Sequence, residues 1–304
     1  MVDLSSLTTE SRNLKTTNLD SMTALEIVSV MNSEDKKVPE AINKILPDIA
    51  LAAEAAKNAL ENNARIVYVG AGTSGRLGVL DAVECMPTFG VSNNTVIALI
   101  AGGQNAFIKA VEGAEDDTDA AICDLKSVNL SKNDFVIGIA ASGRTPYVCS
   151  AIRYAASIGC HTAAVTCNPN SPLGALSEIP VEAVVGPEIL TGSTRLKAGT
   201  AQKMILNMIS TAAMVLCGRA YKNLMVDVIC KNEKLLARAV NIVIQATGVD
   251  AETAADVLKK ADGNAKLAIT MILSGTDEVT SEKALIKAKG HVNDALFIIS
   301  GKEK

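Results

Sequence analysis

The chain has few aromatic and few basic residues. Only 3% of its 304 residues are aromatic, and 29 lysines and arginines face 33 aspartates and glutamates, which gives a net charge of -4. A nucleic-acid partner requires a basic face and stacking rings, so this composition argues against one. No stretch approaches the roughly 18 apolar residues of a membrane span, and no basic segment precedes an apolar one near the start. We therefore expect a soluble, cytoplasmic protein that does not bind a membrane.

Metal-binding and disulfide patterns are missing as well. The seven cysteines include no C-x-x-C pair, and the two histidines, His161 and His291, lie far apart. An odd set of this kind fits reduced thiols in a cytosolic core rather than a disulfide framework. The histidines have no metal-ligand spacing around them, so we expect no zinc site.

Apolar residues are abundant and periodic. They make up 48% of the chain, enough to bury a substantial core, and strand-like runs alternate with helix-like stretches in the middle. The expected strands are residues 65–70, 95–100, 134–140, 161–167 and 181–186, and the expected helices between them are 74–86, 105–127, 146–158 and 171–178. This alternation predicts an α/β fold, a doubly wound parallel sheet flanked by helices.

The flanking regions differ from this middle part. Residues 1–18 are polar and predict an extended arm. Thr23 and Glu26 form a capping-box pattern, which predicts a helix to about Met31. Residues 33–62 predict a longer helix that is interrupted near its two prolines. The expected later helices are 197–219, with an apolar face wide enough for a dimer interface, then 227–246, 250–261, 264–273 and 281–300. We expect three parts: residues 1–62, an arm and helices; 63–222, the α/β domain; and 223–304, a small helical domain.

A glycine-rich loop follows the first expected strand. Residues 70–78 read Gly-Ala-Gly-Thr-Ser-Gly-Arg-Leu-Gly, and they can open a helix whose free N–H groups, joined by the hydroxyls of Thr73 and Ser74, favour a phosphate. The spacing G-x-G-x-x-G also matches the dinucleotide fingerprint, but no acidic residue lies between positions 85 and 111, where that fingerprint requires one. A tight turn without a ligand remains a further interpretation.

A second loop repeats the design. After the apolar run at 134–140, a turn of small residues carries Ser142 and Thr145, and Pro146 stands where a helix would begin. Two loops with hydroxyl groups at strand ends predict one phosphorylated small molecule held between them, although a serine in such a turn is often only a helix cap.

Two glutamates near these loops are candidate acid–base groups. Glu84 is expected at the end of the helix that the first loop starts, where the negative end of the helix dipole and apolar neighbours disfavour its ionised form. That is what a general acid requires. Glu115 follows the second expected strand among other acidic residues, which are equally compatible with a solvated helix start.

The two loops, residues 70–78 and 140–147, resemble the sugar-isomerase (SIS) domain of phosphosugar enzymes. Further matching segments are residues 7–10, 81–85, 111–116 and 191–200. With them, the chain is similar to the N-acetylmuramic acid 6-phosphate etherases over nearly its whole length, most loosely in the last hundred residues. The resemblance departs at Val83 and Met86, where the family usually has serine and proline beside the proposed acid.

This resemblance implies a lyase of cell-wall sugar recycling. Such an enzyme removes the D-lactyl ether from N-acetylmuramic acid 6-phosphate by elimination and water addition, giving N-acetylglucosamine 6-phosphate and D-lactate. It implies that Glu84 is the acid for the leaving lactate and Glu115 the base at C2. No metal or organic cofactor is expected, because the aldehyde of the opened sugar accepts the electrons.

The resemblance also implies the phosphate site and leaves other functions open. The residues implied to hold the 6-phosphate are Thr73, Ser74, Ser142 and Thr145, with Arg144 as a further candidate. Ser193, Arg195 and Lys197 lie in a matching stretch but receive no individual role. The alternatives are a phosphosugar-binding regulator without catalysis and an aldose–ketose isomerase, and a homodimer is expected.

Overall fold

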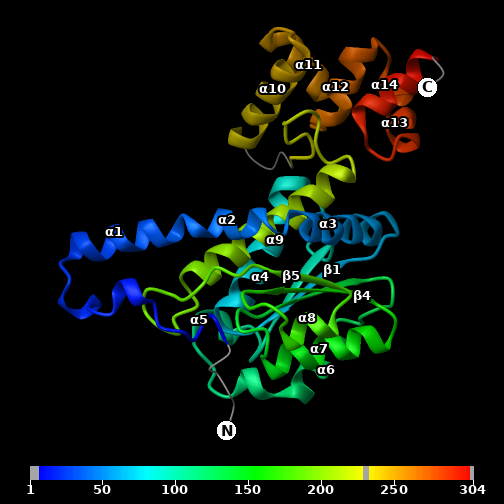
Figure 1. Ribbon diagram of the computed structural model, residues 1–304. Helices are drawn as coiled ribbons and strands as arrows, with labels where there is room; N and C mark the ends of the chain where they lie inside the picture. The colour runs from blue at the N-terminus through cyan, green and yellow to red at the C-terminus, as the bar shows by residue number, and fades with distance from the viewer. Residues whose placement is uncertain (1–6, 229–232, 302–304) are drawn as a thin grey trace. The chain divides into compact units, whose positions relative to one another are not determined.

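A single parallel sheet forms the centre of the α/β part. The computed structural model describes residues 7–228 and 233–301 (Figure 1). The strands are β1 (Ile66–Gly70), β2 (Val96–Ile100), β3 (Phe135–Ile139), β4 (His161–Thr166) and β5 (Ile179–Glu182), in the order β2-β1-β3-β4-β5. All neighbours pair in parallel, with Gly70 beside Ile100 on one side and Ile139 on the other. The predicted fold class is confirmed; the fifth strand begins two residues earlier than expected.

Helices cover both faces of this sheet (Figure 1). One face carries α3 (Leu46–Glu61) with the first parts of α4 (Gly72–Phe89) and α9 (Lys197–Leu216), and the other carries α6 (Thr118–Ser127), α7 (Pro146–Ser157) and α8 (Pro172–Leu176). Side chains alternate between the faces along each strand. Val67 and Val69 belong to the core that includes α7, whereas Tyr68 packs against Gly78 of α4.

The helices before the sheet begin where the capping box and the prolines of the sequence predict. The capping box is confirmed: Thr23 and Glu26 exchange both of its hydrogen bonds, and α1 (Ala24–Asp35) ends later than expected. After α2 (Lys37–Asn43), α3 begins with Pro47 in its first turn, so the predicted interruption there is also confirmed. The arm is more folded than expected, since its described part contains the 3-10 helices η1 (Leu14–Thr16) and η2 (Leu19–Ser21).

Two expectations for helices in the α/β part are wrong. The expected helix 105–127 is three pieces, α5 (Asn105–Ile108), η3 (Ala114–Asp116) and α6, because the backbone extends at Lys109 and turns left-handed at Gly113 with φ 73°. Helix α4 does not end before Pro87; it contains this proline and continues to Phe89. Glu84 therefore lies inside the helix and not at its negative end, where it was expected.

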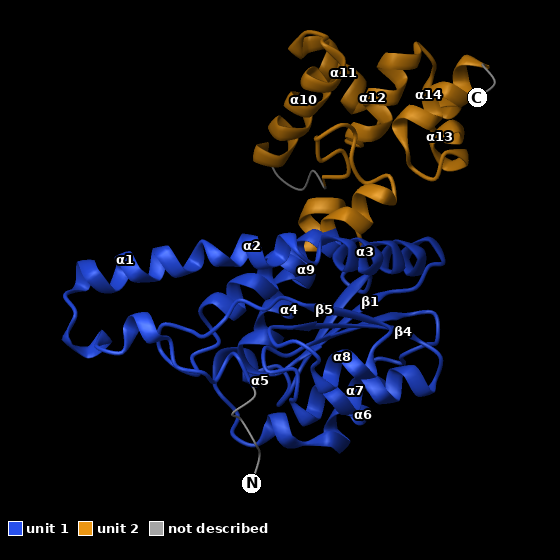
Figure 2. Cartoon of the chain, in the orientation of Figure 1, with its two compact units in different colours: residues 1–83, 93–210 blue, residues 84–92, 211–304 orange. Residues whose placement is uncertain are grey.

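The chain divides into two compact units (Figure 2). One comprises residues 1–83 and 93–210, and the other residues 84–92 and 211–304. The sheet and both loops lie in the first unit. The three-part boundaries expected from the sequence stay a prediction. Among the described residues, no helix has both the length and the apolar character that crossing a bilayer requires.

The second unit contains five short helices after the end of α9. They are α10 (Glu233–Thr247), α11 (Ala251–Lys260), α12 (Ala265–Ser274), α13 (Glu278–Lys287) and α14 (Val292–Ser300). The stretch 281–300, expected as one helix, is divided at Gly290. The expected start of α10 near residue 227 is only partly testable, because residues 229–232 lie outside the described residues.

This unit contains a structural repeat that the sequence did not reveal. The turn between α11 and α12 closes with a 2.9 Å bond from Gly263 N to Leu258 O, and the turn between α13 and α14 closes with a 2.9 Å bond from Gly290 N to Leu285 O. Both glycines have positive φ. The two helix pairs are therefore built on the same turn.

Candidate functional site

Both predicted loops emerge at the point where the strand order reverses. The chain runs from β1 outward to β2 and then returns to β3, which pairs with the other side of β1. In open α/β sheets, ligands bind beyond the carboxyl ends of the strands at this switch point. Residues 71–75 follow β1 and residues 140–145 follow β3, so the structure brings the predicted phosphate residues of both loops to one edge of the sheet.

The first loop is closed by two glycines in close contact. A Cβ on Gly70 would lie 2.7 Å from Gly75 N, and one on Gly75 would lie 2.6 Å from Ile100 Cγ1. A larger residue at Gly75 would force the loop away from β2, and one at Gly70 would force the end of β1 away from the start of α4. The loop enters α4 at Gly72, and the first N–H groups of a helix have no acceptor within it. This end of α4 therefore presents donors and the positive end of a dipole to an anion.

The two hydroxyl residues of the first loop differ in their surroundings. Thr73 is partly exposed, whereas Ser74 is only 8% exposed and its hydroxyl donates a 3.0 Å hydrogen bond to Gln202 Oε1 on α9. Gln202 could not be identified from the sequence, because a glutamine gives no indication of a contact with a residue 128 positions away.

The second loop requires a glycine at position 143, and the hydroxyl group of Thr145 does not cap the helix that follows. Gly143 has φ 66°, and a Cβ there would lie 2.4 Å from Ser171 Cβ, so both conformation and space require glycine. Ser142 Oγ accepts a 3.3 Å hydrogen bond from Arg144 N. Helix α7 begins at Pro146 as predicted, and Thr145 at its N-cap makes no side-chain cap bond.

The N-terminal arm holds the second loop through Asn168. This buried amide follows β4 and accepts from Thr8 N at 2.7 Å. Its Nδ2 donates to Thr9 Oγ1 and to Ala141 O, both at 3.0 Å. The arm motif at residues 7–10 is thus a structural clamp beside Ser142, a role that the sequence analysis did not assign.

Glu115 lies in the connection after β2. It is exposed in η3, and Arg76 of α4 holds the preceding α5 by donating to the carbonyl oxygens of Ala106 at 2.8 Å and Phe107 at 2.9 Å. Glu84 is exposed on α4 and belongs to the second compact unit. The catalytic roles of both glutamates stay proposals.

Helix α4 is anchored by a buried carboxylate one turn before Glu84. Asp81 accepts hydrogen bonds from Tyr68 Oη at 2.8 Å, Asn207 Nδ2 at 2.7 Å and Ser210 Oγ at 3.1 Å. These donors come from β1 and α9, so Asp81 fixes α4 to both elements. The pattern of the sequence gave no sign of this cluster.

Lys197 has a structural role that the sequence analysis left unassigned. Its ammonium group is buried and lies 2.9 Å from Glu34 Oε2. The buried carboxylate of Glu188 accepts from the backbone N–H groups of Lys197 and Ala198, at 3.1 and 2.9 Å, and so caps α9. Burial raises the pKa of Glu188 more than these hydrogen bonds lower it. Ser193 and Arg195 lie in the segment between Glu188 and α9 and keep no assigned role.

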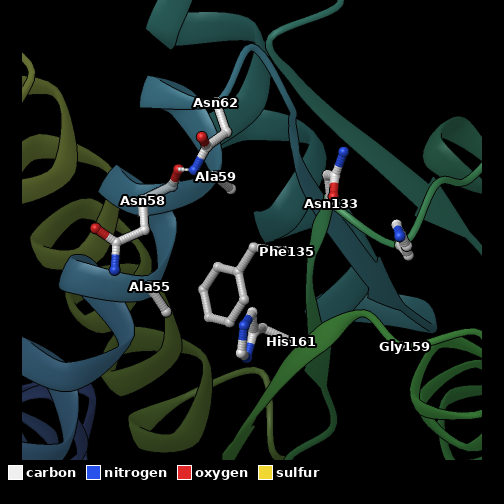
Figure 3. Close-up of a pocket in the computed structure, with 9 residues that line it drawn as sticks. Ala55, Asn58, Ala59, Asn62, Asn133, Phe135, Gly159 and His161 are labelled. Atoms are coloured by element: carbon white, nitrogen blue, oxygen red, sulfur yellow. Dashed lines mark hydrogen bonds between the residues drawn. The ribbon is translucent and has the colours of Figure 1, made fainter.

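A separate cavity lies at the opposite edge of the sheet (Figure 3). It has a volume of about 350 Å³ and lies between Asn58 and Asn62 of α3 and the first residues of β3 and β4, Phe135 and His161. Because these residues are at the amino ends of the strands, the cavity is not part of the loop site. Among the described residues, no cluster of three or more histidine, cysteine or acidic side chains could hold a metal ion.

Comparison with known proteins identifies the relatives of this chain. The profile of the glucokinase regulatory protein N-terminal SIS domain matches residues 48–156, and that of the SIS domain matches residues 119–212. A phosphoheptose isomerase from Francisella tularensis is 20% identical with a TM-score of 0.49, covering 64% of this chain and 100% of its own.

Relatives of much higher identity match nearly the whole length of the chain. An N-acetylmuramic acid 6-phosphate etherase of Actinobacillus pleuropneumoniae serotype 7 is 54% identical over 293 residues, covering 96% of each chain. One of Clostridium beijerinckii is 52% identical over 301 residues, covering 99% of each. The chain belongs to the N-acetylmuramic acid 6-phosphate etherase family.

Proposed function

We propose that this protein cleaves the D-lactyl ether of N-acetylmuramic acid 6-phosphate, releasing D-lactate and N-acetylglucosamine 6-phosphate. It acts as a carbon–oxygen lyase in the recycling of cell-wall amino sugars. One observation in the structure carries the proposal: two hydroxyl-bearing loops of a family member meet at the switch point between β1 and β3.

The loops supply the phosphate site. The N-terminal ends of α4 and α7 direct backbone N–H groups and the positive ends of their dipoles toward a bound anion. Thr73, Ser74, Ser142 and Thr145 add hydroxyl groups, and Arg144 adds a positive charge. Holding the 6-phosphate here fixes one end of an extended, ring-opened sugar relative to the reacting carbons.

The reaction requires a base and an acid. Once the ring opens, the C1 aldehyde makes the C2 proton acidic, and Glu115 removes it. The C3–O bond then breaks, Glu84 protonates the departing lactate oxygen, and water adds at C3 of the unsaturated aldehyde. Both side chains are exposed, so a substrate can reach them. The aldehyde is the electron sink, so the scheme uses no metal or organic cofactor.

The direct test is D-lactate release by the purified protein. We expect lactate from N-acetylmuramic acid 6-phosphate and none from the unphosphorylated sugar, because the loops require the phosphate. Saturable binding of the phosphosugar without lactate would instead identify a phosphosugar-binding regulator. Turnover of fructose 6-phosphate without lactate release would identify an isomerase.

Oxygen-labelled water tests the chemical route. Elimination breaks the bond between C3 and the ether oxygen, and water then supplies a new oxygen at C3. In H₂¹⁸O, the label should therefore enter N-acetylglucosamine 6-phosphate and not the hydroxyl of lactate. Label in the lactate hydroxyl would show cleavage on the other side of the oxygen and exclude this route.

The cytoplasmic location and the homodimer belong to the same proposal. The exposed apolar residues of α1 and α4, including Leu25, Val28, Leu80 and Val83, support an interface between two copies. Light scattering on the purified protein gives its mass in solution, and a monomer would contradict the dimer.

A further inference from the structure

The N-terminal arm holds one carboxylate that the proposed chemistry does not use. Glu10 is partly buried, and its carboxylate makes no hydrogen bond or ion pair with any residue that the structure describes. Two polar neighbours in the arm do have partners: Thr8 Oγ1 donates to Asn168 Oδ1 at 2.8 Å, and Ser11 Oγ donates to Leu7 O at 3.0 Å. Charged groups that lose contact with water are normally paired. The carboxylate of Glu10 is therefore available to a ligand.

The arm places Glu10 beside the second loop. Asn168 Oδ1 accepts from Thr8 N at 2.7 Å, and its Nδ2 donates to Ala141 O at 3.0 Å. A backbone N–H only donates and a carbonyl oxygen only accepts, so these two bonds fix the orientation of the amide. Ala141 directly precedes Ser142, one of the proposed phosphate residues. Glu10, two residues beyond Thr8, is therefore close to the second loop.

The other neighbour of Glu10 is the segment that leads to the first loop. Gly192 has φ 78°, and a Cβ there would lie 3.3 Å from Glu10 Oε2, so glycine both adopts this turn and leaves the carboxylate its space. Further along the segment, Gly199 N donates to Thr194 O at 2.9 Å, and a Cβ on Gly199 would lie 3.6 Å from Thr73 Cγ2. The carboxylate of Glu10 therefore lies between the two loops.

The chemistry of a carboxylate determines which part of the phosphosugar it can contact. An ionised carboxylate only accepts hydrogen bonds, and it repels both the phosphate and the lactyl carboxylate of N-acetylmuramic acid 6-phosphate. Beside the phosphate it can therefore contact only a hydroxyl group. The phosphate is on C6, and in the closed ring the oxygen on C5 carries no proton. The C4 hydroxyl is thus the nearest donor that the closed and the open sugar share.

We propose that Glu10 accepts a hydrogen bond from the C4 hydroxyl of the sugar while the two loops hold its 6-phosphate. This inference rests on the proposed function, because it assumes that the loops bind that phosphate. Glu10 is then a specificity-determining residue. A site that hydrogen-bonds a hydroxyl rejects the analogue that lacks it, since the polar group of the site is then left unpaired. Residues 7–10 and 191–194 together form the part of the site next to the phosphate.

Two ligands separate this contact from the phosphate site. N-acetylglucosamine 6-phosphate has the C4 hydroxyl, whereas inorganic phosphate has no sugar hydroxyl. In Glu10→Ala we expect the phosphosugar to bind about 10- to 100-fold more weakly, which is the effect of losing a hydrogen bond to a charged group. Inorganic phosphate should bind as tightly as to the wild type or more tightly, because the substitution removes a nearby negative charge. Titration calorimetry measures both dissociation constants.

A ligand without the hydroxyl completes a thermodynamic cycle. The 4-deoxy analogue of N-acetylglucosamine 6-phosphate should bind to the wild type about 10- to 100-fold more weakly than the parent sugar phosphate, but to Glu10→Ala with the same affinity as the parent. Glu10→Gln keeps the shape and an acceptor but not the charge, so its preference for the parent should be intermediate. Ser11→Ala is the matched control, because it removes the bond from Ser11 Oγ to Leu7 O in the same turn and should leave every affinity unchanged.

The outcomes separate this inference from the function on which it rests. Equal weakening of phosphosugar and inorganic phosphate binding in Glu10→Ala would indicate general damage to the arm and overturn the inference. A wild type that binds the parent and the 4-deoxy sugar phosphates equally would also overturn it, and this comparison does not depend on the folding of any variant. In either case, D-lactate release by the same wild-type preparation would leave the etherase function standing. A wild type that binds neither ligand would overturn both the loop assignment and the inference.

Discussion

The ammonium group of Lys197 lies 2.9 Å from Glu34 Oε2, and each side chain is only 1% exposed. The pair joins the first turn of α9 to the end of α1, across 163 positions of sequence. Glu34 also accepts from Lys37 at 2.7 Å and from Asn13 Nδ2 at 3.0 Å, so both of its oxygens accept hydrogen bonds.

We expect Lys197→Met to lower the free energy of unfolding by about 3 to 5 kcal/mol, because it leaves the carboxylate of Glu34 buried without its buried partner. Lys37→Met is a matched control, because it removes a 44% exposed lysine from the same carboxylate and should cost about 1 kcal/mol or less. Urea unfolding of both variants measures the difference. Equal losses of stability in the two variants would show that the burial of Lys197 does not determine how much its ion pair contributes.

The same carboxylate predicts a pH dependence of stability. Burial alone would raise the pKa of Glu34, but hydrogen bonds from Lys37 and Lys197 outweigh it and lower the pKa from 4.5 to about 2. Because the folded-state value is the lower one, the stabilisation by Glu34 is complete above about pH 4.5 and is lost as the pH falls toward 2. Stability of Glu34→Gln, measured from about pH 7 down to about pH 3, should fall less steeply than that of the wild type.

Replacing either proposed catalytic carboxylate should slow turnover without abolishing binding. For Glu84→Gln and Glu115→Gln we expect kcat to fall by about 10² to 10⁴, the usual range for loss of a general acid or base. Both side chains are exposed, so the fold should survive. Glu112→Gln, an exposed neighbour of Glu115, is the control and should keep the wild-type rate. Wild-type turnover in both test variants would mean that other residues perform the chemistry.

Much of the fold was predictable because its signals are local. Alternating apolar runs gave the five parallel strands, and the residues at helix starts gave the capping box at Thr23 and the start of α7 at Pro146. The errors were also local in origin: apolar and acidic residues continue across Gly113, so the pattern gave no sign of the left-handed turn that divides the expected helix there.

The contacts that fix the site were not predictable, because they join distant segments. Asn168 binds Thr8 across 160 positions, and Ser74 binds Gln202 across 128. The residue type indicates that a buried amide side chain forms hydrogen bonds, but it does not indicate with which residues. The loops themselves could be identified because their chemistry lies within a few consecutive residues of each strand end.

Two glycine-to-alanine variants distinguish a required glycine from a replaceable one. In Gly75→Ala the new methyl group would lie 2.6 Å from Ile100 Cγ1 and 2.9 Å from Gly70 O, so we expect a loss of about 1 to 3 kcal/mol from overpacking. In Gly199→Ala the nearest atom is Thr194 O at 3.5 Å, and alanine favours the helix by up to about 1 kcal/mol. Thermal unfolding should therefore shift in opposite directions, and a stable Gly75→Ala would contradict the close contact of the loop with β2.

The clamp at Asn168 should couple the N-terminal arm to the second loop. Asn168→Ala removes the acceptor for Thr8 N and the donor to Ala141 O, two partly buried hydrogen bonds whose loss should cost about 1 kcal/mol each. We expect faster amide hydrogen exchange in residues 7–10 and, because Ala141 precedes Ser142, also in residues 140–143. Asn168→Asp keeps the shape and the acceptor for Thr8 but places an oxygen against Ala141 O, so it should loosen the loop while holding the arm more firmly. Faster exchange confined to the arm in Asn168→Ala would show that the loop is held without it.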